Sequence, residues 1–192
     1  MILRVKKFTK SSLRLFMKVN HEHSNIPQLY KNIYISFEIA LAACICFLLG
    51  FYMSNLLHRG QSIIGGFWCL ITVSTILQLS IRDSYLAAFQ ILVGSVIGGI
   101  TAFIFTSVLG YYYYVMILAV AISVFITASI GLENAVKMSS ANAGVIVALG
   151  LYQPSYSPFL NTGLRLIETF SGTAIALFFI FISRIFRIRT DD

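Results

Sequence analysis

Three charged side chains lie inside long apolar stretches of the sequence, namely Glu38, Arg165 and Glu168. A charge at the centre of a bilayer costs about 2.5 kcal/mol or more, so such residues are candidates for function. Arg165 and Glu168 are three residues apart, which places them on one face of a helix, where they can pair. Two interpretations remain open: the pair fixes helix packing, or Arg165 receives a substrate carboxylate while Glu168 takes up a proton.

Glu38 lies close to the start of its apolar stretch. It either sits near the membrane surface or takes part in proton coupling with Glu168. Arg165 is close enough to a helix end for its long side chain to reach the headgroups, which leaves a further structural explanation open for it.

Three amide side chains add hydrogen-bonding capacity within or beside the apolar stretches. Asn142 is surrounded by small residues and needs a partner across a helix interface, so it either joins two helices or contacts a substrate. Gln78 and Gln153 end two similar stretches, where they either terminate helices or line the two mouths of a path. We therefore include Asn142, Gln78 and Gln153 with Arg165 as candidate substrate-binding residues.

The sequence offers little for an enzyme or a metal site. All three histidines precede residue 59 and lie outside the apolar stretches, so no set of Ser, His and Asp can be assembled. His21-Glu22-His23 supplies two metal ligands without a partner cluster, which favours a solvated loop. Neither an HExxH motif nor a phosphate-binding loop occurs. We expect no enzymatic activity, no metal and no cofactor.

The three cysteines all lie within apolar stretches, at Cys44, Cys46 and Cys69. An odd number in such places argues against a disulfide framework. We expect small apolar side chains in a membrane interior.

The composition is that of a membrane protein. The 192 residues are 58% hydrophobic and only 11% charged, with a mean hydropathy of +0.84, whereas soluble domains are about a quarter charged. The net charge is +7, and seven of the 14 basic residues precede residue 32 while three follow residue 183. Because these charges flank the apolar stretches, they favour contact with the lipid bilayer and its headgroups over nucleic-acid binding.

The apolar stretches predict an all-α membrane protein with six transmembrane helices. A span needs about 20 mostly apolar residues, and continuous runs favour helices over a barrel. Residues 84–132 contain no charge and are too long for one crossing, so we place a break at Gly110 and the four tyrosines after it. The predicted spans are 33–53, 62–81, 86–109, 113–130, 138–152 and 159–182, with Arg82-Asp83 as a turn.

Six crossings place both termini on one side of the membrane. That side holds 12 of the 14 basic residues, so the positive-inside rule predicts cytoplasmic termini. The predicted organisation is a basic cytoplasmic or interfacial segment (1–30), a transmembrane domain (31–187) and a cytoplasmic tail (188–192).

The second half of the sequence resembles the first. Aligning Gly94 with Gly172 pairs Gln90 with Glu168 and Gly98 with Ala176. A repeated unit of three spans reverses direction, so we predict two inverted three-helix repeats. The small residues of this pattern are predicted helix-packing positions: Gly94, Gly98, Gly99 and Gly172.

Two blocks of sequence resemble a known family. They are Phe67-Trp68-Cys69 through Ile76-Leu77-Gln78, Ser84 and residues 90–99, and then the run from Arg165 to Leu177. Both are similar to the membrane domain of fusaric acid resistance proteins and aromatic acid exporters. The resemblance covers about residues 30–185 and implies a bacterial inner-membrane protein for efflux of aromatic carboxylates or related compounds.

Two departures from the family matter. Members often carry a basic residue three positions before the glycine of the third span, where this sequence has Ile91. Many also carry a large cytoplasmic domain or a second six-span half, so we expect a homodimer. The expected function is export of a small organic anion bound between the two halves and coupled to protons; the alternative is a non-transporting membrane scaffold or assembly subunit.

Overall fold

The computed structural model describes residues 28–57, 62–153, 157–186 and 189. The chain divides into two compact units, Met1–Tyr34 and Ile35–Asp192. Residues 1–27 of the predicted basic N-terminal segment, which include His21-Glu22-His23, and all of the predicted tail except Arg189 lie outside the described residues.

Every regular element in the described part of the chain is a helix, which confirms the all-α prediction. The elements are α2 (Gln28–Leu57), α3 (Ser62–Ile76), α4 (Ile81–Leu109), α5 (Tyr113–Ser129), the short 3-10 helix η1 (Glu133–Ala135), α6 (Val136–Tyr152) and α7 (Pro158–Ile185).

Within the described residues, four segments are long and apolar enough to cross a membrane: Leu29–Leu56, Ile81–Leu109, Glu133–Tyr152 and Pro158–Ile185. α3 and α5 are apolar but have only 15 and 17 residues. At 1.5 Å per residue they extend about 22 and 26 Å, less than the roughly 30 Å of a hydrocarbon core. Each predicted span therefore corresponds to an apolar helix, but two of these helices are short.

The boundary between α3 and α4 differs from the prediction. α3 ends at Ile76, five residues before the end of the predicted span, and residues 77–80 form a non-helical link. The predicted turn at Arg82-Asp83 is instead the first turn of α4. Ser80 caps this helix by accepting a hydrogen bond from the Asp83 N–H at 3.0 Å, and the Asp83 carboxylate favours the positive helix start.

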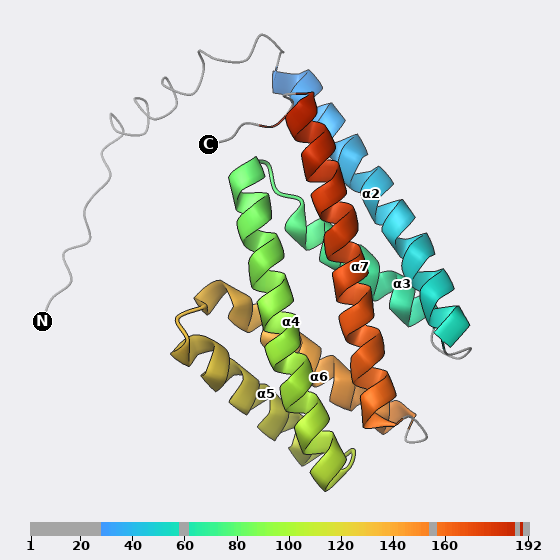
Figure 1. Cartoon of the computed structure of the whole chain (residues 1–192), viewed down its shortest axis with the longest axis vertical. Coiled ribbons are helices and arrows are strands. Elements are labelled where there is room, and N and C mark those ends of the chain that lie inside the picture. The colour runs from blue at the N-terminus through green and yellow to red at the C-terminus, as the bar shows by residue number, and fades with distance from the viewer. Residues whose placement is uncertain (1–27, 58–61, 154–156, 187–188, 190–192) are drawn as a thin grey trace, which may run out of the picture. The chain divides into compact units, whose positions relative to one another are not determined.

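The second unit is organised around α4 and α7, which lie side by side and antiparallel (Figure 1). α6 packs on α4 and on α5, and α3 packs on α7. The part of α2 that follows Tyr34 contacts α3 and α7 through the side chains described below. This arrangement turns one face of α7 toward α2 and α3.

Glycines set the closest helix approaches. A Cβ placed on Gly94 would lie 2.5 Å from the Ala135 carbonyl oxygen, and one on Gly98 would overlap the Ser139 carbonyl group. α4 and α6 can therefore approach backbone to backbone, as small residues permit in membranes. Gly172 brings α7 equally close to α3, with an added Cβ only 2.8 Å from Thr72 Cβ.

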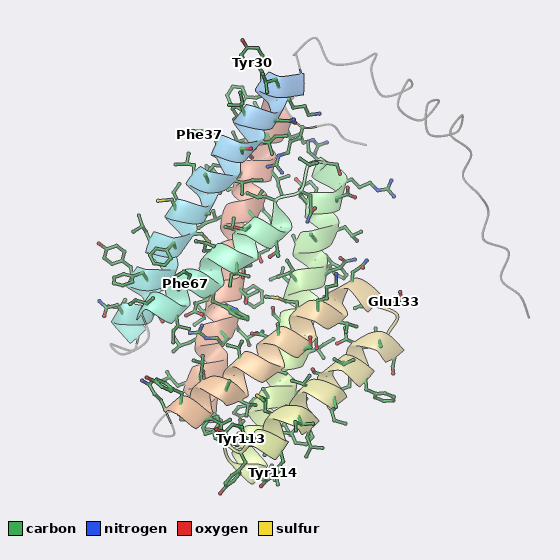
Figure 2. All side chains as sticks on the ribbon, turned by 180° about the vertical axis from the view of Figure 1, so that it is seen from behind. Tyr30, Phe37, Phe67, Tyr113, Tyr114 and Glu133 are labelled. Carbon is green, nitrogen blue, oxygen red and sulfur yellow. The ribbon has the colours of Figure 1, made fainter. Side chains whose placement is uncertain are left out.

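Large apolar side chains cover the outer surface of the second unit. Phe37, Phe67, Tyr113 and Tyr114 are all more than half exposed, and Figure 2 shows them directed away from the helix interfaces. Such a surface suits surrounding lipid, and tyrosines at a helix start suit the membrane interface.

The close approach at Gly98 predicts a sharp sensitivity to one methyl group. Gly98→Ala should destabilise the protein by about 1–3 kcal/mol, because α4 must move away from the Ser139 backbone. Gly163→Ala is the matched control, since an added Cβ there meets no atom within 4 Å. Thermal unfolding in detergent measures the difference, and equal melting temperatures for the two variants would contradict this packing.

Candidate functional site

Arg165 and Glu168 form a two-contact ion pair in the interior. Arg165 Nη1 lies 2.7 Å from Glu168 Oε2, and Nη2 donates to Oε1 at 2.9 Å. The two side chains are 0% and 1% exposed. The contact through Nη2 is a charge-assisted hydrogen bond, whereas the contact through Nη1 is a close approach of opposite charges without hydrogen-bond geometry.

The pair lies where α2, α3 and α7 meet. Ser54 of α2 donates to Glu168 Oε1 at 3.2 Å. Gly65 of α3 is so close that a Cβ there would lie 2.6 Å from the same oxygen. One turn along, Trp68 of α3 donates through its indole N–H to Thr169 Oγ1 of α7 at 3.1 Å. The glycine therefore leaves room for a charged group, rather than loosening the helix start.

Glu38 is buried at another level of α2, only 4% exposed. Ser183 donates to its Oε1 at 2.8 Å, and Arg189 Nη2 lies 3.1 Å from its Oε2. Glu38 therefore pairs with Arg189 and not with the Arg165–Glu168 pair. The sequence reading missed Arg189 as its partner, and the signal available was the run of arginines that closes the last apolar stretch.

The three amide candidates make hydrogen bonds with backbone groups. Asn142 of α6 is fully buried and donates to the Ser95 carbonyl oxygen of α4 at 2.9 Å, which fits the helix-joining alternative. Gln78 is exposed and donates back to the Thr75 carbonyl at 2.9 Å. Gln153 caps α6, with its N–H donating to the Leu149 carbonyl at 2.9 Å.

A buried polar stripe on α7 was only partly recognised from the sequence. Asn161 donates to the Ile146 carbonyl of α6 at 2.7 Å, and its own amide oxygen is buried without a hydrogen-bond partner in the described part of the chain. Asn161, Arg165, Glu168 and Gly172 are spaced four, three and four residues apart, so they share one helix face. That spacing is the sequence signal that identifies Asn161.

The cysteines are not merely apolar filling. Cys46 of α2 and Cys69 of α3 are both fully buried, with their sulfurs 2.8 Å apart, and Cys46 also donates to the Cys69 carbonyl at 3.1 Å. Both are free thiols, and Cys44 is exposed. Among the described residues, no group of three or more His, Cys, Asp or Glu side chains could hold a metal ion.

Comparison with known proteins gives one match. A family model described as fusaric acid resistance protein-like matches residues 41–179. This range contains Asn142, Arg165 and Glu168 but neither Glu38 nor Arg189. No curated protein and no solved structure matches the chain.

The Arg165–Glu168 pair predicts an asymmetric response to mutation. Arg165→Met should destabilise the protein by about 3–5 kcal/mol, because it leaves a buried carboxylate without its cation. The double variant Arg165→Met/Glu168→Leu should recover much of this loss, since neither charge remains. Thermal unfolding in detergent measures the stability of both variants. The control is Ile167→Ala, because the Ile167 side chain is 40% exposed. A double variant no more stable than the single one would contradict this account.

Proposed function

The chain belongs to the fusaric acid resistance protein-like family, and on this premise we propose that it exports aromatic carboxylates or related small organic anions from the bacterial cytoplasm. The family and the apolar helices make it a membrane transport-related protein. The substrate class is our proposal and rests on the chemistry of the buried site.

The observation that carries the proposal is the fully enclosed Arg165–Glu168 pair. A guanidinium binds a planar carboxylate through two parallel hydrogen bonds. When Glu168 takes up a proton its negative charge disappears, and Arg165 then needs another anion. A substrate carboxylate supplies that anion, so proton uptake and substrate binding are linked at one arginine.

The proposed topology has six crossings in two inverted three-helix halves, with cytoplasmic termini. In two such halves, α2, α3 and α4 correspond to α5, α6 and α7. The contact of α3 with α7 then corresponds to the contact of α6 with α4, and both contacts occur. This swapped pairing supports the repeat. The register of the sequence alignment fits less well, because Gly94 contacts the start of α6 whereas Gly172 contacts the middle of α3. We propose a homodimer as the working assembly.

One observation favours the alternative of a non-transporting scaffold. At the α2–α3 contact, a Cβ on Gly65 would lie only 2.5 Å from Ser54 Cβ, so this interface is tightly closed beside the ion pair. A transporter must open it, whereas a scaffold need not. The transport assay below separates the two.

Cells that produce the protein should accumulate less radiolabelled benzoate or salicylate than cells that lack it. Arg165→Gln should reduce export roughly 30-fold or more, because it removes the buried partner of the substrate charge. Glu168→Gln should abolish the dependence of export on external pH, and Ile167→Ala should export normally. Equal accumulation with and without the protein over a panel of aromatic acids would favour the scaffold.

A further inference from the structure

The end of α7 lies on the same side of the second unit as the start of α4 (Figure 1). A second buried arginine, Arg189, follows the end of α7. Arg189 is 3% exposed. Its Nη2 lies 3.1 Å from Glu38 Oε2, and its Nη1 donates to the Gln78 carbonyl oxygen at 2.5 Å and lies 3.5 Å from Ser84 Oγ. This one side chain therefore joins α2, the link after α3, and α4.

The contact with Gln78 answers a backbone requirement. Residues 77–80 are not helical, so their polar backbone groups need other partners wherever water is scarce. Ser84 Oγ accepts from the Gln78 N–H at 2.9 Å, and Arg189 donates to the Gln78 carbonyl. Nη1 therefore binds the link between α3 and α4, whereas the edge of the guanidinium that carries Nε and Nη2 does not contact this link.

Of the two nitrogens on this edge, Nη2 makes a hydrogen bond to a described residue and Nε does not. Glu38 reaches Nη2 through one oxygen, and its second oxygen accepts from Ser183 instead. Nε of Arg189 is buried and has no hydrogen-bond partner among the described residues. A carboxylate bound side-on engages both Nε and Nη2, so a ligand can make one more hydrogen bond here than Glu38 makes.

The two arginine–glutamate pairs stand at separate levels of the α2–α7 contact. Ser54 contacts Glu168, and Glu38 contacts Ser183. These contacts are sixteen residues apart on α2 and fifteen on α7, or roughly 22–24 Å. Under the proposed topology the Arg165 pair lies toward the outer side and the Arg189 pair lies at the cytoplasmic mouth.

We propose that Arg189 is a second carboxylate-binding site, which loads the organic anion at the cytoplasmic mouth, and that Glu38 is an internal competitor that occupies this site when it is empty. Displacement of Glu38 by the substrate carboxylate also releases α2 from the end of α7. The proposal rests on the proposed export function. Glu38, Ser183 and Arg189 all lie outside the family match at residues 41–179, so the site is an addition to the matched domain.

Equilibrium binding of radiolabelled benzoate to the purified full chain tests this assignment. Nanodiscs of phosphatidylcholine carry no net negative headgroup, so benzoate is the anion offered, and benzamide serves as the uncharged analogue. Glu38→Gln should tighten benzoate binding about tenfold, because the competitor is gone while the buried cation remains. The double variant Glu38→Gln/Arg189→Gln should lose this gain, benzamide should not compete, and Ile185→Ala should bind as the wild type does.

If the pair were purely structural, Glu38→Gln and Arg189→Gln would both lower the melting temperature and neither would tighten benzoate binding. Under our proposal both variants lower the melting temperature alike, but only Glu38→Gln tightens benzoate binding. Absence of tightening in Glu38→Gln, or tightening that persists in the double variant, overturns the assignment. If Arg165→Gln abolishes export while Arg189→Gln changes neither export nor binding, only this second site fails. A wild-type protein that neither binds nor exports benzoate overturns the export function as well.

Discussion

The structure depends on one constraint: a charge enclosed by lipid-facing helices must have a partner of opposite charge. The chain meets it twice, with Arg165 against Glu168 and Arg189 against Glu38. Each carboxylate also accepts a hydrogen bond between α2 and α7, from Ser54 or from Ser183. The charges therefore fix how α2 lies along α7, which apolar contacts alone would leave free to slide.

The two pairs differ in how far apart their partners lie along the chain. Glu168 lies three residues from Arg165 on the same helix and meets it through both oxygens. Glu38 is 151 residues from Arg189 in sequence and meets it through one. The Arg165–Glu168 pair can therefore form within α7 alone, whereas the Arg189–Glu38 pair depends on where α2 lies.

Much of this architecture could be predicted from the sequence, because apolar runs and their breaks determine helices in a membrane protein. The Arg165–Glu168 pair also follows from its three-residue spacing. The break before α4 was misplaced, since hydropathy does not register a serine cap such as Ser80. The partner of Asn142 could not be predicted, because it is a backbone carbonyl, which every residue carries. The partner of Glu38 lies beyond the last apolar stretch, where the run of arginines indicates a cation but not which arginine pairs with Glu38.

The neighbouring sulfurs of Cys46 and Cys69 have a practical consequence. They come from α2 and α3, which also approach each other closely at Gly50, Gly65 and Gly66. Oxidation in air would tether α2 covalently to α3 near the middle of both helices. A sample handled without reductant would then contain α2 and α3 joined covalently, and a reducing buffer would prevent this.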